Sequence, residues 1–291
     1  MPRRPVDLSA HINPTVLRGH PADFPVTLQP IFVSKADGYQ PVPHRRAVVR
    51  EDTGAPISIL SDRYQLMPHP RILEIVEEAI RPLDVGPVPR GIFVDRGGAR
   101  MRALFKFPSL AKPVVRNDDI CPCLKIQNSY DGTSRISIHI GAFRFVCTNL
   151  AVGGGGVFAG GFMSVHAGEI PIEKVAAQLA AYLLDFDQIV TTYRAWTATA
   201  VPREDIGRIL GVFPPRVRDA ILKRVVESQS VTVYDAYNQA TWYATHEMRS
   251  YRTAFALLAL VNRTFQTQFP LNPVDERMLP AGPRDLQAVP A

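Results

Sequence analysis

The sequence lacks any long hydrophobic run. Its longest uninterrupted apolar stretch, Ala254–Val261, lies between Arg252 and Arg263, whereas a membrane-spanning helix needs about 20 apolar residues. The N-terminus begins MPRR and continues through polar residues and prolines instead of the apolar core of a secretory signal. We therefore expect a cytoplasmic protein, in the host-cell cytoplasm if a phage encodes it, with no membrane partner.

Cysteine and lysine are also scarce. Three cysteines in 291 residues argue for reduced thiols and against a disulfide framework. Cys121, Cys123 and Cys147 could supply thiolates, but the C-x-C spacing is not that of a zinc knuckle and no histidine follows at ligand spacing. We expect no metal and no cofactor. The net charge of +6 comes mainly from 27 arginines against 6 lysines. The arginine fork suits phosphate, although a genome rich in G and C enriches arginine as well.

The commonest catalytic motifs are missing. His246-Glu247 begins an H-E-x-x-H motif, but Ser250 occupies the position of the second histidine. The sequence contains no G-x-S-x-G elbow, Walker pattern or Rossmann glycine fingerprint. The acidic residues Asp118, Asp119 and Asp131 are typical of turns. We expect no enzyme, and the alternative is a metal-dependent nuclease that uses these aspartates.

Positive charge is concentrated near the middle of the chain. Residues 90–150 contain 10 basic and 4 acidic residues, whereas residues 151–291 contain 13 of each. The net charges of the two remaining segments cancel each other. Residues 1–50 contain 7 basic and 3 acidic residues, and residues 51–89 contain 3 basic and 7 acidic residues. The surplus therefore falls in one segment, which is also the most strand-like part of the sequence.

The patterns predict an α+β fold, with an antiparallel β-hairpin sheet and a packed helix in the first half and a helical second half. The expected organisation is an extended N-terminal arm (1–45), a β-rich core with a basic sheet face (46–152), a glycine-rich loop or hinge (153–168), a helical region (169–270) and a flexible tail (271–291). Within the arm we expect only a short strand at 31–33.

Individual elements follow from periodicity and turn signals. Apolar residues at helical spacing predict an amphipathic helix over 70–81. Short apolar runs around turns rich in glycine and aspartate predict three hairpins. Their strand pairs are 47–50 with 57–60, 92–94 with 100–107, and 123–128 with 135–148. In the second half, five helices are predicted over 171–196, 203–210, 215–227, 233–247 and 252–269.

Strand alternation sorts the charged residues onto one face. Along one predicted strand, Arg100, Arg102 and Lys106 alternate with apolar residues, and Lys125 and Arg135 alternate in the same way on the neighbouring strands. If the strands pair, one face of the sheet is apolar and packs on the helix at 70–81. The other face is basic and is left for solvent or a ligand.

Several short blocks carry a resemblance. The chain is similar to the phage/plasmid-like protein family, a domain-of-unknown-function family of prophages and plasmids, over roughly residues 45–250. The blocks are 48–54 (VVREDTG), 61–65 (SDRYQ), 128–132 (NSYDG), 143–150 (FRFVCTNL), 232–238 and 244–246. Thr148 occupies the position where this family usually has glutamine. The order of hairpin, helix and further hairpins also resembles the core of single-strand annealing recombination proteins, which assemble into rings around a basic groove.

These observations favour a binding protein for single-stranded DNA from a phage or mobile element, working as a homo-oligomer and possibly as a ring-forming annealing mediator in DNA recombination. The expected DNA-binding residues are Arg100, Arg102, Lys106, Lys125, Arg135, Arg144 and the aromatic Tyr130, with Phe93 as a second stacking residue. One alternative is that acids of the helical half neutralise these cations and that the aromatics belong to the core. Another is a protein-interaction or anti-defence factor whose basic face meets an acidic protein.

Overall fold

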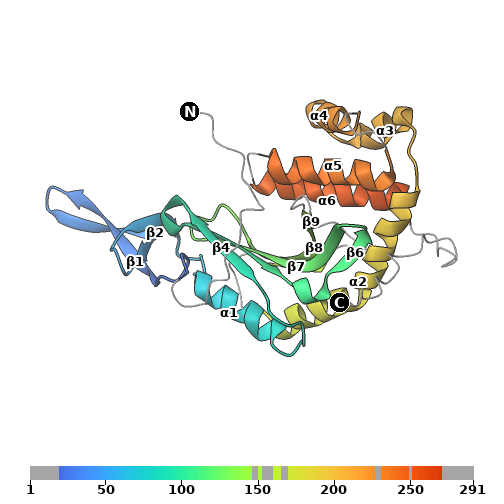
Figure 1. Cartoon of the computed structure of the whole chain (residues 1–291). Helices are drawn as coiled ribbons and strands as arrows, with labels where there is room; N and C mark the ends of the chain where they lie inside the picture. The colour runs from blue at the N-terminus through green and yellow to red at the C-terminus, as the bar shows by residue number, and fades with distance from the viewer. Residues whose placement is uncertain are drawn as a thin grey trace, which may run out of the picture.

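The computed structural model describes residues 20–145, 150–152, 160–164, 170–226, 231–248 and 251–270. Over these residues the fold is α+β, with two antiparallel sheets in the first half of the chain and helices in the second, as predicted (Figure 1). Among the described residues, no helix is both long and apolar enough to cross a membrane.

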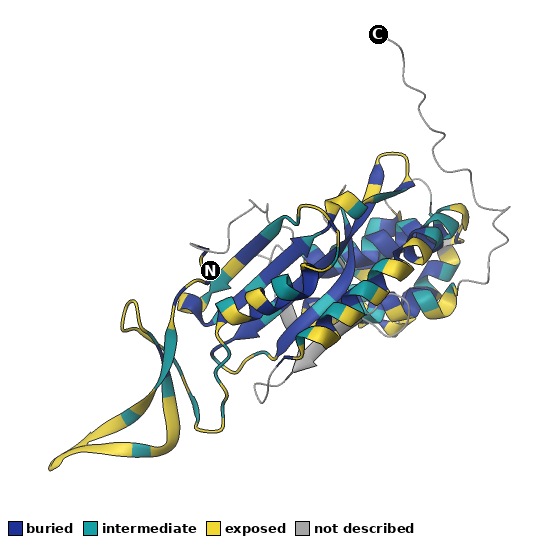
Figure 2. Cartoon of the chain, turned by 90° about the horizontal axis from the view of Figure 1, so that it is seen from below, coloured by how far each residue is buried: buried dark blue, intermediate teal, exposed yellow. Residues whose placement is uncertain are grey.

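The smaller sheet has three strands in the order β1 (Val26–Lys35), β2 (Gly38–Arg50) and β3 (Pro56–Ser61). The predicted hairpin of the second and third strands is confirmed. The predicted short strand at 31–33 is too short, because β1 and β2 pair from Val26 with Arg50 out to Lys35 with Gly38, with one register shift, and form a ribbon. This ribbon projects from the body of the protein and is mostly exposed towards its tip (Figure 2).

The larger sheet has seven strands, with the path β10-β8-β7-β5-β4 and with β6 and β9 paired to β7 and β8. The strands are β4 (Arg90–Asp95), β5 (Arg100–Lys106), β6 (Lys112–Val115), β7 (Asp118–Ser129), β8 (Ile136–Arg144), β9 (Leu150–Val152) and β10 (Gly160–Ser164). The two predicted hairpins β4–β5 and β7–β8 are confirmed as antiparallel pairs. Residues 146–149, at the end of the last predicted strand, lie outside the described residues.

Two predictions about this sheet are wrong. Asp118 and Asp119 are not turn residues but begin β7, because the turn comes earlier, at Asn117, whose φ is 63°. The prediction of a loop or hinge over 153–168 is wrong for Gly160–Ser164, because these residues form β10, which pairs with the open edge of β8. The remaining residues of that segment, like residues 1–19 of the arm and the tail from 271, lie outside the described part of the chain.

The helices agree with the predicted ranges to within two residues at each end. They are α1 (His69–Ile80), α2 (Ile172–Ala198), α3 (Arg203–Ile209), α4 (Pro215–Val226), α5 (Val233–His246) and α6 (Tyr251–Gln268). Short 3-10 turns occupy Arg96–Gly98, Pro108–Leu110 and Leu210–Val212. Helix α1 has Pro70 in its first turn, where the fixed φ of proline suits a helix and its missing N–H breaks no hydrogen bond, and α2 begins directly after Pro171. The start of α5 is fixed by a capping box between Thr232 and Asp235.

One hydrophobic core joins the large sheet to the helices. Helix α1 lies under the sheet with the N-terminal part of α2 in the view of Figure 1, and α5 and α6 lie higher in that view and contact β9 and α2. The predicted apolar face is buried with α1, since Met101, Ala103 and Phe105 share the core with Ile72 and Val76. A second small cluster, made of Phe24, Val48 and Tyr130, joins the three-stranded sheet to the large one.

Candidate nucleic-acid interface

Strand register places most of the predicted basic row on one face. Arg102 lies opposite Gln127, Leu104 opposite Lys125, and Lys125 opposite His139, so the side chains of Arg100, Arg102, Lys106 and Lys125 lie on the face turned away from α1. Arg144 does not belong to this row. It lies opposite Ile120, on the other face of the sheet. Arg135 precedes β8 and is exposed.

The arginines of the row are paired with carboxylates. Arg100 Nε donates to Asp131 Oδ2 at 3.1 Å, and Arg102 Nη2 donates to Asp95 Oδ2 at 3.1 Å. Lys106 lies over the ring of Phe143, with its ammonium 4.5 Å from the ring centroid. The alternative that acids neutralise the row is therefore supported, but these acids are Asp95, which ends β4, and Asp131, in the turn after β7, and do not come from the helical half.

The prediction that Lys125 contacts phosphate is wrong for this conformation. Its side chain lies in the middle of the sheet and is only 4% exposed. Burial lowers the pKa of Lys125 well below its ordinary value, because a charged ammonium loses its hydration there. Burial also lowers the pKa of the neighbouring His139 to about 4, and the charge of Lys125 adds to this effect. The imidazole is therefore neutral at pH 7.

Tyr130 is likewise not the exposed stacking residue that was predicted, because it is fully buried. Its ring stacks on His69 with 3.8 Å between centroids, and its hydroxyl oxygen accepts a hydrogen bond from the His69 backbone at 2.6 Å. Asn128 completes the cluster, with its Nδ2 2.9 Å from His69 Nδ1 and from the Met67 carbonyl. The NSYDG block thus anchors the start of α1. Phe93, 37% exposed, remains available for stacking.

Two tight turns at one end of the large sheet each hold an exposed arginine. Arg96 belongs to the β4–β5 turn, where its φ is 52°, and its side chain is 54% exposed. Arg135 ends the β7–β8 turn and is exposed. Because Arg100, which begins β5, lies opposite Ser129, which ends β7, both turns lie at the same end of the sheet. Asp131 lies between them, within 3.9 Å of Arg96.

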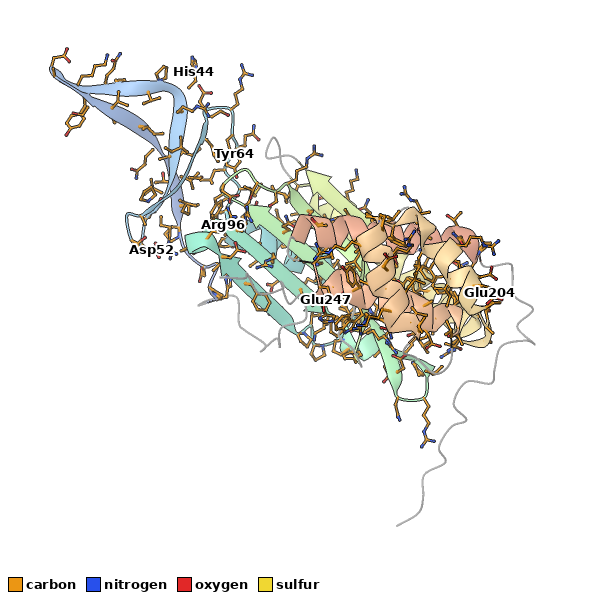
Figure 3. All side chains as sticks on the ribbon, turned by 90° about the horizontal axis from the view of Figure 1, so that it is seen from above. His44, Asp52, Tyr64, Arg96, Glu204 and Glu247 are labelled. Carbon is orange, nitrogen blue, oxygen red and sulfur yellow. The ribbon has the colours of Figure 1, made fainter. Side chains whose placement is uncertain are left out.

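The base of the three-stranded sheet meets this same end. Tyr64, labelled in Figure 3, donates from its Oη to the Ser129 carbonyl at 2.7 Å. The neighbouring Arg63 is exposed. The pKa of Asp62 is lowered by a hydrogen bond with His44 and by the charges of Arg63 and Arg46, so several basic groups surround one carboxylate. We call Arg63, Arg96 and Arg135 the basic end. Sequence reasoning missed Arg63 and Arg96, because one lies outside the basic segment and the other was interpreted as a turn residue.

The carboxylates of the nuclease alternative are not brought together. Asp118 begins β7 and Asp131 follows its end, so roughly 40 Å of extended chain separates them. Asp118 is paired with Arg144 through two oxygens, at 2.7 and 2.5 Å. Burial raises the pKa of the Cys121 thiol to about 12. Within the described ranges no three His, Cys, Asp or Glu side chains form a group that could hold a metal ion.

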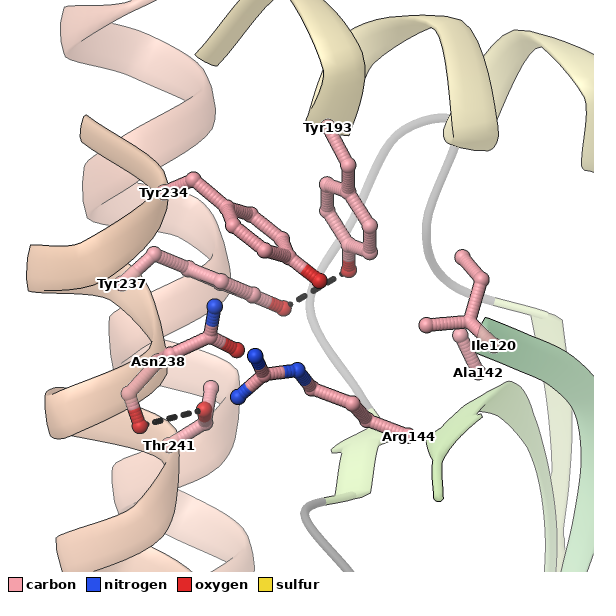
Figure 4. Close-up of a pocket in the computed structure, with 8 residues that line it drawn as sticks. All are labelled: Ile120, Ala142, Arg144, Tyr193, Tyr234, Tyr237, Asn238 and Thr241. Atoms are coloured by element: carbon pink, nitrogen blue, oxygen red, sulfur yellow. Dashed lines mark hydrogen bonds between the residues drawn. The ribbon is translucent and has the colours of Figure 1, made fainter. Parts of the chain in front are cut away.

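A small pocket lies between β7, β8 and the helices (Figure 4). Its lining includes Arg144 and three tyrosines, of which Tyr193 and Tyr237 share a hydrogen bond of 2.9 Å. The Arg144 guanidinium lies 5.3 Å from the centre of the Tyr234 ring. Its cavity volume is about 10 Å³, which is room for about one water molecule. We interpret the pocket as part of the contact between sheet and helices.

Comparison with known proteins shows the family of the chain. Residues 56–278 match a family described as a domain of unknown function, DUF932. The chain belongs to this family. The DUF932 region begins at β3 and runs through α6, so it contains the basic end and all of the large sheet. Strands β1 and β2 precede it. No match is found among curated proteins or among solved structures.

Proposed function

We propose that this DUF932 protein binds single-stranded DNA, with the basic end as its phosphate-binding surface, and that it serves a phage or other mobile element as an oligomeric recombination mediator. The observation that carries the proposal is the position of Arg63, Arg96 and Arg135, three exposed guanidinium groups on three neighbouring turns at one end of the sheets. The chain's net charge of +6 is consistent with a polyanionic ligand.

The arrangement suits a single strand for two reasons. Guanidinium groups bind phosphate oxygens with two parallel hydrogen bonds, and groups on rigid turns are already positioned to follow a backbone. Phe93 is part-exposed on β4, opposite Arg102 on the same face. An unpaired base could stack on its ring, which is worth about 1–3 kcal/mol per base.

The paired arginines of the sheet have a supporting role in this proposal. Arg100 holds Asp131, and Asp131 in turn accepts hydrogen bonds from the backbone and the hydroxyl of Thr133. Burial alone would raise the pKa of Asp131, but these hydrogen bonds and the Arg100 charge outweigh it and lower the pKa. The carboxylate therefore stays ionised and fixes the β7–β8 turn that presents Arg135.

The test is fluorescence polarisation of a labelled oligonucleotide across a range of salt concentrations. Each lost phosphate contact lowers the salt slope by about 0.7 for single strands, so the triple variant Arg63→Gln/Arg96→Gln/Arg135→Gln is expected to lower it by about 2 and to weaken binding. The matched control is Arg208→Gln/Arg216→Gln/Arg218→Gln, which removes three helical arginines from α3 and α4.

Two results would overturn the proposal. One is the absence of oligonucleotide binding at low salt, which would instead direct attention to an acidic protein partner, to be sought by pull-down after nuclease treatment. The other is an equal loss of affinity in the triple variant and in the control. A comparison of single-stranded and duplex oligonucleotides of equal length tests the strand preference, because only the single strand offers unpaired bases to Phe93.

A further inference from the structure

The projecting ribbon of β1 and β2 exposes large apolar side chains. We define residues 31–43 as the distal arm. Tyr39 is 80% exposed, Phe32 52% and Val33 47%. Such exposure is unusual for aromatic residues in a soluble protein when several lie together. On the base of the same sheet, Ile59 is 60% exposed.

Apolar residues occupy both faces of the distal arm. Phe32 lies opposite Pro41 and Ser34 opposite Tyr39, so Phe32 and Tyr39 are diagonal neighbours on one face. Val33 alternates onto the other face, opposite Gln40. An isolated two-stranded hairpin is marginally stable in water. A surface that covers these side chains would therefore stabilise the arm.

Charge argues against nucleic acid as the occupant. The distal arm contains one cation, Lys35, and one carboxylate, Asp37, and it has no histidine. The net charge of the distal arm is zero, so it offers a phosphate backbone no net electrostatic attraction. The arginines Arg45 and Arg46 lie below the distal arm, towards the body. An occupant should therefore be apolar at its centre and acidic at its border.

The chain itself carries a surface of this kind on α2. Leu184 is 84% exposed and lies in line with exposed Ala177 and Ala181 at helical spacing. Asp185, also exposed, borders this strip. Tyr39 and Leu184 are the two most exposed large hydrophobic residues among those that the structure describes. A contact between two copies would cover both.

We propose that the distal arm docks on the α2 strip of a second copy of this chain, with Arg45 facing Asp185 across the border. The area suits an interface: aromatic side chains bury 150–250 Å² each, so Phe32 and Tyr39 leave on the order of 100–200 Å² each to cover. With an equal acceptor surface, two such contacts bury roughly 1,000 Å², the lower end of what a specific interface needs. This assembly does not depend on DNA binding.

Sedimentation equilibrium of the full chain tests the assembly. The wild type is expected to self-associate at micromolar concentrations. Phe32→Ser/Tyr39→Ser and, separately, Leu184→Ser should each raise the dissociation constant at least tenfold. The control Val226→Ser removes a side chain that is 52% exposed on α4 and should leave association unchanged. A monomeric wild type, or equal effects of the control and the arm variants, would overturn the proposal.

Charge reversal and cross-linking test the pairing itself. Arg45→Asp and Asp185→Arg should each weaken association, and the double variant should restore it. In a Cys147→Ser background, mixing Tyr39→Cys protein with Leu184→Cys protein should yield a mixed disulfide dimer in excess over either protein alone. No excess would refute the contact. Short-oligonucleotide affinity is the separate readout: the arm variants should keep it, so failure of the assembly and failure of DNA binding are distinguishable.

Discussion

Replacement of Tyr130 distinguishes a structural role from a ligand-stacking role. In Tyr130→Phe the ring still stacks on His69, but the backbone N–H of His69 loses the hydroxyl oxygen that accepts its hydrogen bond at 2.6 Å. Leaving a buried donor unsatisfied costs about 1–3 kcal/mol. Tyr130→Leu also loses the ring contacts with His69 and Phe24, so we expect a free energy of unfolding about 3–5 kcal/mol below that of the wild type.

Urea denaturation followed by circular dichroism measures these differences, with Tyr39→Phe as the control. Tyr39 is 80% exposed, so its variant should lie within about 0.5 kcal/mol of the wild type. The oligonucleotide affinity of Tyr130→Leu is then measured where the variant is still folded. A stacking role predicts a loss of about 1–3 kcal/mol, whereas the buried position predicts no loss. Unchanged stability in both Tyr130 variants would refute the reasoning.

Three further predictions concern other parts of the fold. In the β4–β5 turn, Gly98→Ala should lower the free energy of unfolding by roughly 1–3 kcal/mol more than Gly97→Ala does. A Cβ at position 98 would lie 2.5 Å from Phe24 Cζ, whereas the space at Gly97 is open. Equal melting temperatures of the two variants would contradict this. Thr232→Ala removes the capping box of α5 and should lower the free energy of unfolding by about 1 kcal/mol, with a change below 0.5 kcal/mol as the contrary result. His139 has a pKa of about 4 in the folded protein, against 6.5 when unfolded. The unfolded chain therefore binds the proton first, and the free energy of unfolding should fall by up to about 3 kcal/mol as pH drops from 6.5 to 4. Denaturation at several pH values should show a shallower fall in His139→Gln, and an identical fall would exclude His139 as the cause.

The sequence predicted four strands of the large sheet, β4, β5, β7 and β8, because their signals are local, and it missed β6, β9 and β10. The alternation along 100–107 and the turn residues that follow 94 and 129 determine which strands pair and which face is apolar. The length of the arm was missed, because the register of β1 and β2 shifts between Pro30 and Phe32 and the prolines interrupt the alternation that identifies a strand.

The site was predicted only in part. Alternation correctly placed Arg100, Arg102 and Lys106 on one face, but which carboxylates lie beside them depends on how the turns fold back. Arg100 and Asp131 are 31 residues apart in the sequence and meet only because β5 and β7 pair. Burial of Lys125 and Tyr130 is also a property of the assembled layers, and neither residue differs in local pattern from an exposed one.

The register shift between Pro30 and Phe32 divides the β1–β2 ribbon into two parts under different constraints. Below it, Leu28 and Val48 pack with Tyr130, and any change there disturbs the core. Beyond it, the side chains are largely exposed, and the matched family region begins only at residue 56. The side chains on which the proposed docking rests thus lie outside both core clusters, so the distal arm could be exchanged by design without a change in the core.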